Sequence, residues 1–155
     1  MQDQVRSSGE MASLRAGAKL SAALGSGWLP PAWPESPGWC REGEYVFDAV
    51  ACEVWSRPAT EERTVDDLLA LQSEAYAVEW IPKGTGLLYV TSDVASVDLQ
   101  GTWYAFPYGW RHSWHARFPY LDVHPPYGSP VRLKVDEPHR LKVLIDYLIA
   151  GGQHS

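Results

Sequence analysis

The sequence predicts an α+β fold, a single domain in which a mostly antiparallel sheet carries about three helices on one face. Segments with the two-residue period of strands outnumber segments with the helical period, and most of them follow one another directly. The chain has 155 residues, the length of one ordinary domain. A hydrophobic content of 45% and a charged content of 21% are typical of a globular protein.

The N-terminal part predicts a helix followed by an extended strap. Ser7 and Glu10 have the spacing of a capping box, so we expect a helix that begins near residue 8 and ends at the glycines of 25–27. Residues 28–40 hold four prolines and three tryptophans, which exclude a helix or a central strand. We interpret them as a strap whose tryptophans dock onto the main body; the alternative is a proline-rich ligand for a partner's groove. The predicted organisation is one domain in three parts: an N-terminal helix and glycine linker (1–27), a Pro/Trp-rich strap (28–43) and an α+β core (44–155).

The middle of the chain predicts a central strand, a helix and a hairpin. Residues 44–56 place apolar side chains on both faces, as in a strand that is covered on both sides. Thr64 precedes a pattern with helical spacing over residues 64–75. Two apolar segments, 75–81 and 87–93, flank a link with two glycines and predict a β-hairpin.

The C-terminal half predicts further strands and a last helix. Residues 94–106 predict a pair of strands interrupted at Gly101. Residues 131–135 alternate apolar and basic side chains, which predicts a strand with one core face and one solvent face. Pro138 lies in the first turn of the helix that follows. The apolar stripe of that helix consists of Leu141, Leu144, Ile145 and Leu148.

The charges are unevenly distributed. Ten acidic and two basic residues lie between Glu42 and Glu79, whereas the part from Gly101 onward has four acidic and six basic residues. The acidic section argues against a nucleic-acid-binding protein, because contacts to phosphates need a basic surface. It favours a protein partner with a basic surface.

Compartment and redox chemistry follow from what the sequence lacks. Cys40 and Cys52 form neither a disulfide framework nor a metal motif, so we expect free thiols. Arg15 and Lys19 interrupt any apolar signal-peptide core, and no segment approaches the ~20 apolar residues of a membrane span. We therefore expect a small soluble cytoplasmic protein with no membrane contact.

Residues 103–128, WYAFPYGWRHSWHARFPYLDVHPPYG, are the most unusual stretch. They contain nine aromatic residues, three histidines and two arginines, and we expect a long stiff loop between two strands. Aromatic and arginine side chains dominate binding hot spots in protein interfaces. The predicted binding residues are Tyr108, Trp110, Arg111, Trp114, Arg117 and Tyr120.

The same stretch offers two kinds of site chemistry. His112, His115 and His124 are candidate ligands for zinc or iron, but no metal-binding fingerprint surrounds them. His112 or His115 paired with Asp122 is a candidate acid–base site for a proton transfer. The sequence has no motif for a nucleophilic serine or for a phosphate-binding loop, and we expect no cofactor.

These observations favour a binding or accessory module over an enzyme. The composition, that of a small acidic domain rich in tryptophan, resembles bacterial or phage accessory proteins such as toxin-neutralising immunity proteins, which implies an immunity- or inhibitor-like role. The alternative is a small single-domain enzyme with a histidine, aspartate and aromatic pocket, which is either metal-dependent or an acid–base catalyst. The two differ in whether the histidines converge on a cavity.

Overall fold

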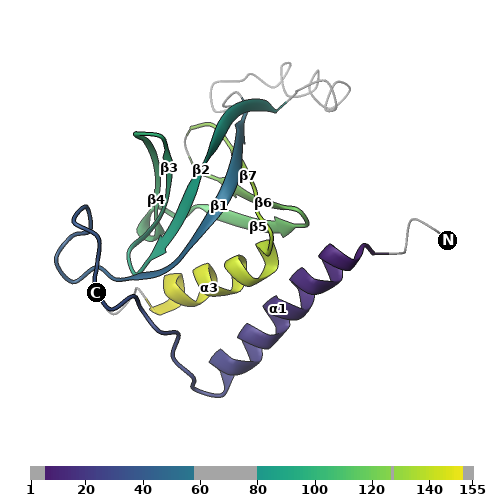
Figure 1. Ribbon diagram of the computed structural model, residues 1–155, viewed down its shortest axis with the longest axis vertical. Helices are drawn as coiled ribbons and strands as arrows, with labels where there is room; N and C mark the ends of the chain where they lie inside the picture. The colour runs from purple at the N-terminus through teal and green to yellow at the C-terminus, as the bar shows by residue number, and fades with distance from the viewer. Residues whose placement is uncertain (1–5, 58–79, 127, 152–155) are drawn as a thin grey trace.

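A seven-stranded antiparallel sheet forms the centre of the computed structural model, with strand order β4-β3-β2-β1-β7-β6-β5 (Figure 1). The structure describes residues 6–57, 80–126 and 128–151. Two helices pack with the sheet, which confirms the predicted α+β class. The elements are α1 (Ser8–Gly25), β1 (Val46–Ser56), β2 (Ile81–Thr91), β3 (Val94–Leu99), β4 (Thr102–Pro107), the short 3-10 helix η2 (Tyr108–Trp110), β5 (Ser113–Arg117), β6 (Tyr120–His124), β7 (Val131–Lys134) and α3 (Pro138–Gly151). The predicted helix over 64–75 lies outside the described residues.

The core lies between one face of the sheet and α3. The predicted apolar stripe of α3 is confirmed, since Leu141, Leu144, Ile145 and Leu148 are all buried, and α3 contacts β5 and β6. The alternation of β7 is confirmed as well, because Val131 and Leu133 are buried whereas Lys134 is exposed. Burial of each large apolar side chain stabilises the fold by about 1.5–3 kcal/mol.

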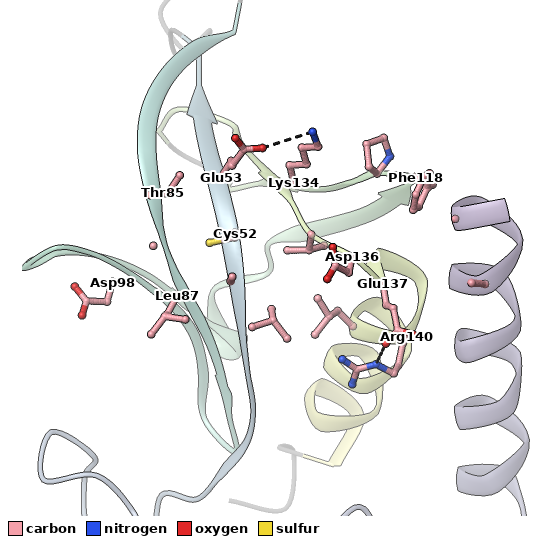
Figure 2. Close-up of a pocket in the computed structure, with 18 of the residues that line it drawn as sticks. Cys52, Glu53, Thr85, Leu87, Asp98, Phe118, Lys134, Asp136, Glu137 and Arg140 are labelled. Carbon is pink, nitrogen blue, oxygen red and sulfur yellow. Dashed lines mark hydrogen bonds and ion pairs between the residues drawn. The ribbon is translucent and has the colours of Figure 1, made fainter. Parts of the chain in front are cut away.

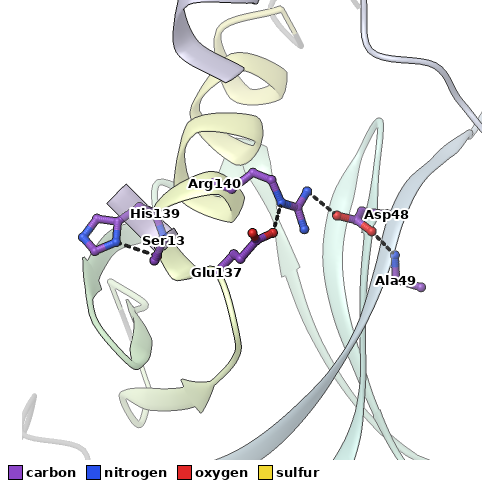
Figure 3. A network of polar contacts seen from close by, with 6 residues as sticks. All are labelled: Ser13, Asp48, Ala49, Glu137, His139 and Arg140. Atoms are coloured by element: carbon purple, nitrogen blue, oxygen red, sulfur yellow. Dashed lines mark hydrogen bonds and ion pairs between the residues drawn. The ribbon is translucent and has the colours of Figure 1, made fainter. Parts of the chain in front are cut away.

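Helix α1 packs on α3 through small side chains (Figure 3). It begins where the capping box predicts, and the backbone N–H of Glu10 donates to Ser7 Oγ at 3.0 Å. Ser13 Oγ lies 2.8 Å from His139 Nδ1, and a Cβ at Gly17 would press on the backbone of the same histidine. Serine and glycine at these positions let the two helices approach closely.

The sheet curls so that its two outermost strands approach each other. Phe106 of β4 and Trp114 of β5 lie at opposite ends of the strand order, yet their ring centroids are 5.7 Å apart. The chain passes between these two strands through η2 and two further residues, so the contact closes the core on that side. Both rings belong to the same buried cluster.

The predicted hairpin over 75–93 is wrong. Ile81–Thr91 is one continuous strand that pairs with β1 along its length, and residues 75–79 lie outside the described part. The glycines serve the strand instead of a turn: a Cβ at Gly86 would overlap the carbonyl oxygen of Asp98 in β3, and Gly84 has φ +124° opposite a register shift in β1. The predicted pair over 94–106 is confirmed as β3 and β4, joined at Gly101 with φ +101°.

The prediction for residues 44–56 is half right. β1 is the fourth of seven strands, and its side chains at Cys52 and Val54 are buried. However, Ala51 and Glu53 on the other face are exposed, so the strand is not covered on both sides. We call the face of the sheet that points away from the buried core the outer face.

The prediction of a long loop over 103–128 is wrong as well. This stretch contains most of β4, all of η2, and both strands of the β5–β6 hairpin. The two-residue period is present, because Trp114 points inward with Leu121 and Val123. The residues that alternate with these three are histidines, an arginine and an aspartate. Because such residues are also typical of functional loops, the sequence did not reveal that they form the solvent face of two strands. Among the described residues, no helix combines the length and apolar character needed to cross a membrane.

Candidate functional site

Aromatic side chains gather on the outer face of β2 and β4, where the strap crosses it. We call Trp33, Trp39, Tyr89 and Trp103 the Trp cluster. The Trp39 ring centroid lies 4.9 Å from that of Tyr89 and 5.2 Å from that of Trp103, and Trp33 meets Tyr89 edge-on at 6.4 Å. Contacts of this kind stabilise a pair by about 0.5–1.5 kcal/mol beyond area burial.

The Trp cluster remains open to solvent despite these contacts. Trp33 is 38% exposed, Trp39 41% and Trp103 43%. Leu87, two residues before Tyr89 on the same face of β2, is 42% exposed and extends the apolar surface. Clustered exposed aromatic residues mark interaction surfaces more often than single ones do.

The strap that carries Trp33 and Trp39 is held by hydrogen bonds at two places. The backbone N–H of Trp33 donates to the carbonyl oxygen of Val46 at 2.8 Å. Farther along, the buried carboxylate of Glu44 accepts from the Thr91 hydroxyl at 2.6 Å and from the backbone N–H of Arg41 at 2.9 Å. The strap has no helix or strand over residues 28–45, as its prolines predict.

A second cluster occupies the outer face of β6 and β7 and includes Trp80, which precedes β2. Arg132 of β7 donates from Nε and Nη2 to both carboxylate oxygens of Asp122, each at 2.8 Å. The guanidinium lies 4.5 Å from the ring centroid of Tyr120 and 4.5 Å from that of Trp80. These interactions raise the pKa of Arg132 above its ordinary value, chiefly through the hydrogen bonds to Asp122. We call these four residues the Arg132 cluster.

Two of the predicted histidines lie beside this cluster. His115 of β5 is the register partner of Asp122, and its ring centroid is 5.5 Å from that of His124. Partial burial lowers the pKa of His124 below its ordinary value; Asp122 opposes this shift, and the charges of Arg57 and Arg132 add to it. His124 is therefore largely neutral at pH 7.

His112 lies apart from the other two histidines, so the three predicted metal ligands are not brought together. Its ring stacks on Trp110 and meets the buried Phe106 edge-on, and desolvation lowers its pKa. In the described part of the chain, no three His, Cys, Asp or Glu side chains lie close enough to hold a metal ion. The set of His112, His115 and His124 therefore does not form a metal centre. Of the two acid–base pairs that the sequence offered, His112 and Asp122 are not brought together, whereas His115 and Asp122 adjoin across the β5–β6 hairpin.

The predicted binding residues are spread over several surfaces. Trp110 is 67% exposed and Arg111 is exposed beside it, whereas Trp114 is only 6% exposed and belongs to the core. Tyr108 is mostly buried, and its hydroxyl donates to the Thr91 carbonyl oxygen at 2.8 Å. Burial raises the pKa of that phenol. Arg117 is exposed on β5, and Tyr120 lies under Arg132.

Sequence reasoning missed the Trp cluster as a site. The strap tryptophans indicated docking, but nothing in the sequence showed that they would meet Tyr89 and Trp103, which lie 50 and more residues away. The two-residue alternation in β2 and β4 was the available signal, because it places both aromatic residues on one face of the sheet, on the two strands that flank β3.

Both cysteines are free thiols, as the sequence predicts. Cys52 is buried, and desolvation raises the pKa of its thiol to about 11. Burial also raises the pKa of Cys40, and the nearby carboxylates Glu44 and Asp93 add to that shift. Neither thiol therefore has the lowered pKa of a reactive cysteine.

Comparison with known proteins identifies no family for this chain: no protein-family model matches it, and no curated protein matches its sequence.

Proposed function

We propose that the chain is a protein-binding module and that the Trp cluster is its main contact surface. One observation carries the proposal: the three tryptophans of this cluster all pack on the ring of Tyr89 and are still 38–43% exposed. Tryptophan is enriched at hot spots, where a buried aromatic anchor supplies much of the binding free energy. A packed cluster also presents its rings in fixed positions.

Acidic residues near the cluster favour a partner with basic character. Asp98 is the register partner of Trp103 on the outer face, and Asp93 and Glu42 are exposed near the ends of β2 and of the strap. Opposite charges speed encounter and select against wrong partners more than they add affinity. An immunity- or inhibitor-like role, in which the module covers part of a basic protein, fits this combination.

The enzyme alternative has less support. His115, Asp122 and His124 do adjoin, but both oxygens of Asp122 are bound by Arg132, and His115 is exposed on the strand surface. None of these three residues lines the cleft beside β1 or the smaller cavity between α1 and α3. A general base needs a free acceptor near a bound substrate.

The test compares two exposed tryptophans. Photo-crosslinking from position 103, with position 110 as the control, identifies the partner in cell extract, and the purified partner is then titrated calorimetrically. We expect Trp103→Ala to weaken binding about 30-fold or more, as for a hot-spot tryptophan. Trp110→Ala is the matched control, since its ring is even more exposed but lies outside the cluster. Equal affinities for wild type and Trp103→Ala would refute the proposal. A loss with Trp110→Ala alone would move the site to the exposed pair Trp110 and Arg111.

A further inference from the structure

One edge of β1 is left open in the described part of the chain. β2 pairs with β1 from Val46 to Ser56, whereas on the other side β7 pairs only with Glu53–Ser56. A cleft of about 1130 Å³ lies along the middle of β1 and extends to the start of α3 (Figure 2). The strap bonds the carbonyl oxygen of Val46 at one end. The open edge therefore runs from Ala49 to Cys52.

The hydrogen-bonding groups of this edge can be assigned from the strand geometry. The N–H of Ala49 donates to its neighbour Asp48 Oδ1 at 2.9 Å, and Asp48 Oδ2 accepts from Arg140 Nη1 at 2.6 Å (Figure 3). Peptide groups of successive residues point to opposite edges of a strand. The peptide groups of Ala51 therefore point to the same edge as those of Ala49, and those of Glu53 reach β7 two residues later.

The cleft has room for a backbone beside that edge. Small residues line it, namely Ala51, Gly86, and Gly9 and Ala12 of α1. Phe118, Val50 and Leu141 supply an apolar wall. A neighbouring strand would lie about 4.8 Å from β1. A cleft lined by small residues next to an open strand edge suits an extended chain better than a compact ligand.

The net charge of the cleft indicates which kind of extended segment fits it. Four acidic and two basic side chains line it: Glu53, Asp98, Asp136 and Glu137 against Lys134 and Arg140. The two basic groups already form ion pairs, Lys134 with Glu53 at 3.6 Å and Arg140 with both Glu137 and Asp48. Among the described residues, no ion pair includes Asp98 or Asp136. The excess of negative charge disfavours phosphate-bearing ligands.

We propose that the open edge of β1 binds an extended, basic segment of a protein partner by strand addition. The segment pairs through its backbone with the carbonyl oxygen of Ala49 and with the peptide groups of Ala51, and it places a lysine or arginine side chain toward Asp136. Strand addition draws affinity from main-chain hydrogen bonds and specificity from alternate side chains. This inference rests on the proposed protein-binding function and names a second surface and the chemistry of the segment that it takes.

The test uses a synthetic octapeptide of alternating lysine and valine as the probe, with the full-length chain. We expect binding by calorimetry, together with slower amide hydrogen exchange at Ala51. The same peptide with alternate backbone N-methyl groups loses the donors that face β1 and should not bind. A peptide of alternating glutamate and valine should bind at least about tenfold more weakly, because it meets the unpaired carboxylates.

Two variants of the chain separate backbone pairing from charge. Ala51→Pro removes the edge donor and should weaken binding about tenfold, whereas Ala51→Ser keeps the donor and serves as its control. The variant Asp136→Asn keeps the hydrogen-bonding shape and should weaken binding about fivefold. Asp146→Asn makes the same change on the exposed side of α3, outside the cleft, and should leave binding unchanged. If Ala51→Pro does not fold, Asp136→Asn and the N-methylated peptide decide.

The possible outcomes separate this inference from the proposed function. Absence of binding, equal binding of the two peptide charges, or slowed exchange away from β1 would each overturn strand addition. If any of these three results is obtained while Trp103→Ala still weakens binding of the partner, only the proposal of strand addition fails. If the lysine peptide binds at Ala49 and Ala51 while Trp103→Ala leaves partner affinity unchanged, only the Trp cluster proposal fails.

Discussion

The two halves of the outer sheet face use aromatic residues in opposite ways. In the half formed by β2, β3 and β4, the rings of the Trp cluster contact one another and remain exposed. In the half formed by β5, β6 and β7, Tyr120 and Trp80 flank the guanidinium of Arg132, and the partner of that charge, Asp122, is 8% exposed. The first half leaves apolar area facing water, whereas the second satisfies its polar groups internally.

This difference separates a contact surface from a structural cluster. A partner that covers the Trp cluster removes apolar area from water, which is favourable at roughly 25 cal/mol per Å² before the costs of association are counted. A partner that covers the Arg132 cluster gains little, because the charges there already have their hydrogen bonds. Substitutions should therefore affect stability in one half and binding in the other.

The largest loss of stability is expected for Trp114, whose ring points into the core and so belongs to neither half of the outer face. Trp114→Ala should lower the free energy of unfolding by about 3–5 kcal/mol, because the ring is 6% exposed and packs on Phe106. Trp110→Ala, only four residues earlier, should change it by less than about 1 kcal/mol, since that ring is 67% exposed. Urea denaturation of the two variants checks this, and similar losses would contradict the placement of the two rings.

The next effect concerns the Arg132 cluster. Arg132→Ala should cost about 2–3 kcal/mol, because it leaves the mostly buried Asp122 carboxylate without its two hydrogen bonds. Removing both partners together should cost less than the sum of the single changes. A double-mutant cycle by urea denaturation measures the difference. Additive losses would mean that the pair contributes nothing, and that the contrast between the two halves does not hold.

A smaller stability effect is expected in the Trp cluster. Trp103→Ala should cost about 1 kcal/mol, since it removes two aromatic contacts from a ring that is 43% exposed. Trp103→Phe should restore part of that loss. Thermal unfolding followed by circular dichroism measures both. A loss as large as that of Trp114→Ala would make Trp103 a core residue and weaken its assignment as a binding anchor.

The smallest effect is a pH dependence in the β5–β7 half. The pKa of His124 is lowered by partial burial, so below about pH 6.5 the unfolded chain binds a proton that the folded chain does not. The free energy of unfolding should therefore fall as the pH drops from 7 toward 5. His124→Asn should show a shallower decrease in urea titrations at pH 7, 6 and 5. An identical slope in the two proteins would show that His124 does not contribute.

Most of the fold could be predicted because its patterns are local. The capping box at Ser7, the alternation of residues 131–135 and the stripe of α3 each specify one element from a few neighbouring residues. The glycines in β2 misled because a turn and a close strand approach both require glycine. The carbonyl oxygen of Asp98, positioned by the pairing of β2 with β3, shows that Gly86 is required for the close strand approach and not for a turn.

The candidate sites were harder to predict because they depend on strand pairing. The adjacency of His115, Asp122 and His124 was within reach, since all three lie on one hairpin. The position of Arg132 beside Asp122 depends on the register of β6 against β7, and the Trp cluster depends on where a strap without regular structure crosses the sheet. These contacts join distant parts of the chain, and no local spacing encodes them.

The two attachments of the strap also bear on the entropy of association. The segment between Trp33 and Glu44 forms a closed loop, with a main-chain hydrogen bond at one end and a buried carboxylate at the other. Trp39 lies within it and is already packed against Tyr89 and Trp103 of the sheet. Ordering a rotamer-rich side chain at an interface costs about 0.5–1.5 kcal/mol. Here much of that ordering is complete before any partner arrives. The substitution Glu44→Ala removes one attachment of the strap and leaves the rings themselves unchanged. It should therefore slow association with the partner and speed its release.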